Sequence, residues 1–115
     1  MNEEISLTRI PPEGHFDRVT YRINEDLVIG NYKIPSGFIT DGLSLPSVVR
    51  AFYSPMGKGF RAAVLHDYLL YEGRKSRRKC AREFRKQLIA DGVNPAITNA
   101  MFMAVRLWDQ THGLG

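Results

Sequence analysis

The chain has 115 residues, a net charge of +4 and a hydrophobic content of 43%, which predicts one globular domain spanning residues 1–115 that folds without disulfides or a structural metal. Its single cysteine, Cys80, excludes an intramolecular disulfide framework. No apolar run reaches the length of about 18 residues that a transmembrane segment needs, and the acidic opening residues do not resemble a signal peptide.

The first third of the chain has the sequence pattern of short β-strands. Residues 19–23 alternate apolar and polar side chains, and residues 27–29 and 32–34 are short apolar runs separated by Gly30-Asn31, a typical hairpin turn. Residues 38–40 follow a Pro-Ser-Gly break and predict another strand. We therefore expect a small antiparallel β-meander.

A polar loop follows the last of these strands. It contains Asp41 and Ser44, and Pro46 is suited to the first turn of a short helix that ends near Phe52. Residues 53–59 form a second loop, rich in glycine, that leads directly into the next helix.

His66 and Asp67 are adjacent titratable residues within an otherwise apolar helical run that ends at Glu72-Gly73. Burying such a pair is costly, by several kcal/mol, unless partners satisfy it. In a functional interpretation, His66, Asp67, Asp41 and Ser44 meet in space as a catalytic cluster. In a structural interpretation, a neutral His66 bonds to a backbone carbonyl and Asp67 caps a neighbouring loop.

Two further helices complete the chain. Ser76 is suited to cap the first, whose apolar face is expected to comprise Cys80, Ala81, Phe84, Leu88 and Ile89. After a stop at residues 91–93 and a cap at Asn94, residues 96–108 are apolar nearly all round, which predicts the most buried helix of the protein. The tail from residue 109 onward is polar and is expected to fray. The predicted fold class is α+β, with a small N-terminal antiparallel β-meander (residues 1–41) packed on a C-terminal three-helix unit (residues 46–108).

Basic residues are concentrated between positions 74 and 86. This segment contains eight lysines and arginines and one acidic residue, Glu83, which gives it a net charge of +7. This asymmetry could attract phosphate groups of nucleic acid or of anionic lipid. We favour the alternative that it is an idle solvated face, because no aromatic residue is interleaved for base stacking. The candidate binding residues are Arg74, Arg77, Arg78, Arg82, Arg85 and Lys86.

Five short motifs follow one another along the chain: Thr40-Asp41-Gly42-Leu43-Ser44-Leu45-Pro46, Pro55-Met56-Gly57, Ala62-Ala63-Val64-Leu65-His66-Asp67-Tyr68-Leu69, Ser76-Arg77 and Val105-Arg106. Over residues 15–108 their order and content resemble a family of small proteins encoded by tailed phages and prophages, domain of unknown function 1353. The resemblance implies a phage origin.

The His-Asp helix is also similar to that of secreted phospholipases of the A-two type. This similarity implies that His66 activates water and that Asp67 ligates calcium together with loop carbonyls from residues 41–44 or 55–59. The chain departs from both families at Ala81, where they carry an aspartate that orients the histidine, and at Leu70, where a tyrosine is common. Asp41 or Asp109 could replace the orienting carboxylate.

Three functions remain open, and whether the protein is an enzyme is undecided. The first is a non-catalytic phage accessory protein, virion- or tail-associated or host-directed, that binds a phage or host protein and needs no cofactor. The second is a calcium- or other metal-dependent hydrolase of lipid esters or cell-envelope bonds that uses His66 and Asp67. The third is nucleic-acid binding through the basic helix at residues 74–86. The expected location is the host cytoplasm, with incorporation into the virion as an alternative.

Overall fold

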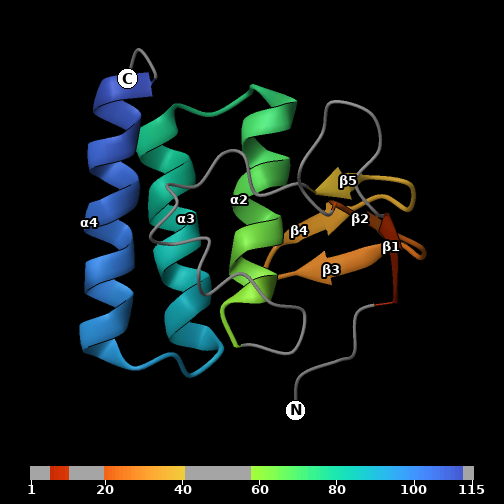
Figure 1. The fold of residues 1–115 in the computed structure, drawn as a ribbon, viewed down its shortest axis with the longest axis horizontal. Coiled ribbons are helices and arrows are strands. Elements are labelled where there is room, and N and C mark those ends of the chain that lie inside the picture. The colour runs from red at the N-terminus through yellow and green to blue at the C-terminus, as the bar shows by residue number, and fades with distance from the viewer. Residues whose placement is uncertain (1–5, 11–19, 41–57, 113–115) are drawn as a thin grey trace.

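The computed structural model describes residues 6–10, 20–40 and 58–112 and confirms the α+β class, with strands first and helices after them (Figure 1). The predicted short helix at residues 46–52, residues 53–57 of the loop predicted at 53–59, and Asp41 and Ser44 lie outside these described residues. The strands are β1 (Leu7–Ile10), β2 (Thr20–Ile23), β3 (Leu27–Ile29), β4 (Tyr32–Ile34) and β5 (Ile39–Thr40). The helices are α2 (Phe60–Glu72), α3 (Arg77–Ala90) and α4 (Pro95–His112).

The strands form two antiparallel sheets rather than one continuous meander. β3 and β4 make the predicted hairpin, with Ile29 opposite Tyr32 and Gly30 at a φ of 59° in the turn. β2 pairs with β1 on one side and with β5 on the other. The β3–β4 hairpin therefore lies between β2 and β5 in the sequence but does not belong to their sheet. The sequence pattern does not single out β1, because a four-residue segment beside Pro11-Pro12 is too short for a clear alternation.

Helix α2 is the centre of the molecule and lies between the strands and α3, with α4 outermost (Figure 1). One side of α2 packs Phe60, Val64 and Leu69 against the buried strand residues Ile23 and Ile34. The opposite side belongs to a second apolar cluster, in which small side chains allow close helix packing. That cluster comprises Ala62, Ala63, Ala81, Phe84, Leu88, Met101 and Val105.

Two predictions about α4 are wrong. It is not the most buried helix: Met103 and Leu107 are 64% and 61% exposed, whereas eight of the 13 residues of α2 are buried. Apolar composition does not identify the central helix, because only an element flanked on both sides can bury its whole circumference. The tail does not fray at residue 109 either, since α4 continues to His112 and Asp109 is buried.

Capping contacts confirm the predicted starts of α3 and α4 and the predicted end of α2. The Ser76 hydroxyl accepts a hydrogen bond from the Lys79 backbone N–H at 3.1 Å, and the Asn94 side chain accepts one from Ala96 at 2.8 Å. Gly73 ends α2 with a φ of 71°. Ile89 was expected on the apolar face of α3, but it is 52% exposed. Among the described helices, none is long and apolar enough to cross a membrane.

Candidate functional site

His66 and Asp67 occupy two different environments although they are neighbours in sequence. His66 is fully buried on the side of α2 that faces α3, and its ring centroid lies 5.4 Å from that of Phe84. Asp67 is 8% exposed, and its carboxylate accepts a hydrogen bond of 2.6 Å from the Thr40 hydroxyl at the end of β5. The side chains of successive helical residues point in directions that differ by about 100°. In a helix that is flanked on two sides, adjacent side chains can therefore contact different elements.

The environment of His66 keeps its imidazole neutral at physiological pH. The pKa of His66 is lowered from 6.5 to about 4, chiefly by burial; the carboxylate of Asp109 raises the pKa and the charge of Arg77 lowers it. A general base is most effective when its pKa lies near the working pH. The His66 ring is therefore poorly tuned for that role in this arrangement.

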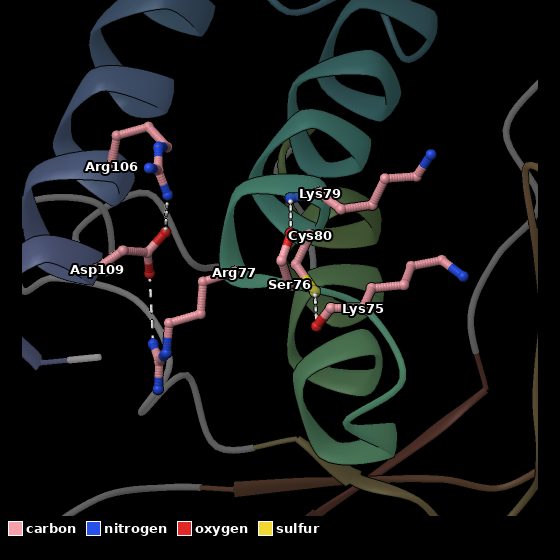
Figure 2. A network of polar contacts seen from close by, with 7 residues as sticks. All are labelled: Lys75, Ser76, Arg77, Lys79, Cys80, Arg106 and Asp109. Atoms are coloured by element: carbon pink, nitrogen blue, oxygen red, sulfur yellow. Dashed lines mark hydrogen bonds and ion pairs between the residues drawn. The ribbon is translucent and has the colours of Figure 1, made fainter. Parts of the chain in front are cut away.

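Asp109 is the carboxylate that acts on His66, and it comes from α4 (Figure 2). It is 1% exposed and accepts hydrogen bonds from Arg77 of α3 at 3.3 Å and from Arg106 of α4 at 3.0 Å. Asp109, with Asp41, was expected from the sequence as a possible substitute for the aspartate missing at Ala81. The same carboxylate also ties α4 to the start of α3.

Cys80 adjoins this network but has the character of a structural residue. Its side chain is fully buried, and burial raises the pKa of the Cys80 thiol. Its sulfur lies 3.9 Å from the backbone oxygen of Lys75 (Figure 2). A buried thiol with a raised pKa is a poor nucleophile.

The predicted catalytic cluster is described only in part. Asp41 and Ser44 lie outside the described residues, so their approach to His66 and Asp67 stays a prediction. Thr40, which was not predicted as a site residue, supplies the contact to Asp67. The sequence signal for it is a hydroxyl on a strand directly before the polar loop. Within the described ranges, no three His, Cys, Asp or Glu residues gather as they would to hold a metal ion.

The predicted basic face divides into residues with different partners. Arg77 is only partly exposed and is ion-paired with Asp109, so it departs from the expected exposed face. Lys86 lies 3.5 Å from the carboxylate of Glu83. Arg74, Arg78 and Arg82 are exposed.

An open groove runs between α3 and α4 and is lined by residues of both helices. Arg82, Arg85 and Lys86 line it from α3, and Asn99, Phe102 and Met103 line it from α4. The Arg85 guanidinium donates a hydrogen bond of 3.3 Å to the Asn99 side chain and lies 5.9 Å from the centroid of the Phe102 ring. The α4 residues were not predicted from the sequence, because only the packing of α4 on α3 brings an aromatic ring beside the basic run.

Comparison with known proteins gives one family. A family model with the description "Protein of unknown function (DUF1353)" matches residues 17–105, which include both the His66 helix and the α3–α4 groove. Searches of the curated proteins and of the solved structures gave no match.

Proposed function

Since the chain belongs to the family described as "Protein of unknown function (DUF1353)", we propose a function from its own geometry, namely that it is a non-catalytic binding protein. The observation that carries the proposal is the complete burial of His66, the residue on which a hydrolytic mechanism would depend. In this proposal His66, Asp67 and Asp109 are framework residues, and the functional surface lies elsewhere.

The contacts of these three residues support a framework role. The Asp109 carboxylate pairs with Arg77 of α3 and with Arg106 of α4, so it holds α3 and α4 together. Asp67 joins α2 to β5 through Thr40. His66 fills space against Phe84 in its neutral form. Each side chain thus connects α2 or α4 to a neighbouring element, as buried polar groups do when they specify packing.

The setting we propose is that of a phage or prophage accessory protein, virion- or tail-associated or directed at a host protein. This part of the proposal is supported by the motif resemblance in the sequence. It places the protein in the host cytoplasm or in the virion, with a phage or host protein as its partner.

The test separates stability from catalysis with one substitution. His66→Ala should lower the free energy of unfolding by roughly 1–3 kcal/mol, because it removes a packed, fully buried ring. Tyr71→Ala, on the same helix but 77% exposed, is the control; it loses only an edge contact with the Phe38 ring and should lower the melting temperature less than His66→Ala does. If His66→Ala melts like the parent protein while abolishing hydrolysis of an ester or cell-envelope substrate, the binding-protein proposal is wrong.

A hydrolase is the second candidate, and the position of Asp109 favours it. The resemblance to phospholipases requires a carboxylate whose charge acts on the histidine. Asp109 of α4 supplies such a carboxylate, because the expected position on α3 is occupied by Ala81. In this candidate Asp67 would ligate calcium with loop carbonyls. Calorimetric titration with calcium tests it: binding at micromolar to millimolar strength that Asp67→Asn abolishes would support the hydrolase, and absence of heat would count against it.

A further inference from the structure

Building on the proposed binding function, we propose that the α3–α4 groove is the docking surface and that its occupant is an acidic amphipathic helix of a partner protein. The groove combines a basic side and an apolar side, which are the two features that such a helix complements. The charge comes from Arg82, Arg85 and Lys86, and the apolar contact comes from Phe102 and Met103.

The basic side of the groove is only slightly neutralised. Glu83 is the acidic residue on α3, and its carboxylate already accepts a hydrogen bond of 3.0 Å from the Tyr32 hydroxyl besides pairing with Lys86. In the described part of the chain no carboxylate pairs with Arg82 or Arg85. Cations held this close together repel one another, and carboxylates of a partner would relieve that repulsion.

The apolar side of the groove belongs to a helix with an unusual outer surface. Residues 95–105 of α4 contain no charged side chain, although α4 is the outermost helix (Figure 1). Met103 is 64% exposed, and the exposed residues Asn99 and Ala100 near it in the sequence are uncharged. Depletion of charge with exposed methionine and a neighbouring aromatic ring is characteristic of the centre of a protein–protein interface. The apolar pattern that predicted burial for this helix is thus explained if a partner covers it.

The same residues fit other anionic partners less well. Single-stranded nucleic acid is bound by several aromatic rings that stack successive bases, whereas this groove has only Phe102, which is half-buried and already faces Arg85. A membrane surface is broad, whereas Arg85 lies inside a groove between two helices. A helix with carboxylates along one edge and apolar residues along the other matches both sides of the groove together.

The test uses synthetic probes of defined chemistry and fluorescence anisotropy. The first probe is a labelled peptide of about 16 residues with a leucine face flanked by glutamates, and the second has the same composition in an order that destroys the helical periodicity. We expect the amphipathic peptide to bind at least about tenfold more tightly than the reordered one, and to bind more weakly as salt rises. An oligothymidylate and vesicles containing phosphatidylglycerol are the competing probes.

Variants then locate the binding. The triple variant Arg82→Glu, Arg85→Glu, Lys86→Glu should weaken peptide binding at least about tenfold. The matched control Arg9→Glu, Arg22→Glu, Lys79→Glu changes net charge equally at exposed positions off the groove and should retain binding. Because Arg85 is half-buried, the variant Arg82→Glu with Met103→Ser, both exposed, repeats the test if the triple variant does not fold.

The outcomes separate this inference from the proposed function. Equal binding of the two peptides, equal loss in the control variant, or groove-dependent binding of only the oligothymidylate or the vesicles would each overturn the acidic-helix inference. The proposed function fails on a different result, namely a normally folded His66→Ala protein that has lost hydrolytic activity. Groove-dependent, tenfold preferential binding of the amphipathic peptide supports the inference.

Discussion

Replacing Asp109 by asparagine should destabilise the protein more than any change to an exposed ion pair. The carboxylate is 1% exposed and lies 3.3 Å from Arg77 and 3.0 Å from Arg106. Removing one member of a fully buried ion pair costs about 3–5 kcal/mol. The two arginine side chains are 32% and 20% exposed and remain partly solvated without the carboxylate, so the expected loss falls to about 2–3 kcal/mol.

Thermal and urea unfolding followed by circular dichroism measures this loss. For a domain of this size 1 kcal/mol corresponds to roughly 3–5 °C, so Asp109→Asn should lower the melting temperature by about 6–15 °C. Asp26→Asn is the matched control, because it removes an equally direct ion pair to Lys33 at a surface position and should shift the melting temperature by less than about 2 °C. A melting temperature for Asp109→Asn as close to the parent's as that of the control would refute the argument that this carboxylate holds α4 in place.

Three other outcomes are expected. The pKa of His66 is lowered, chiefly by burial, from 6.5 to about 4, so between pH 6.5 and pH 4 the unfolded chain protonates this imidazole and the folded chain does not. The free energy of unfolding should therefore fall as pH decreases through this range, by up to about 1.4 kcal/mol per pH unit. His66→Gln should flatten the dependence of urea-unfolding stability on pH in this range. Ser76→Ala should cost about 1 kcal/mol in chemical unfolding by removing the α3 cap. Thr40→Val should cost about 1–3 kcal/mol by leaving the buried Asp67 carboxylate without its hydroxyl donor, whereas Thr40→Ser should restore most of that stability.

The sequence predicts the local elements well because their signals are local. Gly30-Asn31 specifies the hairpin turn, Ser76 and Asn94 specify helix starts, and each is satisfied by contacts within a few residues. The pairing of β2 with β5 depends instead on contacts between distant segments, such as the hydrogen bond from Ile23 to Phe38. A two-residue strand such as β5 carries no pattern that selects its neighbour.

The candidate site follows the same division. The presence of His66 and Asp67 on one apolar helix was readable from the sequence, and so was the basic run before and within α3. Their partners were readable only in part: Asp109 was one of two possible partners of His66, and Phe102 was not selected, because periodicity describes α4 only as an apolar helix. From the sequence, the charge of Asp109 indicated a solvent-exposed side chain. In the structure, two arginines from different helices make its burial favourable.

The placement of α2 explains why adjacent titratable residues here need not share a chemical task. A helix that packs on strands with one side and on another helix with the opposite side buries residues in both directions, so His66 meets Phe84 while Asp67 meets Thr40. Each polar group then stabilises a different boundary of the central helix. Under the binding-protein proposal, the functional surface lies where two helices are exposed to solvent together. The α3–α4 groove is such a place, because basic residues of one helix lie beside uncharged, exposed residues of the other.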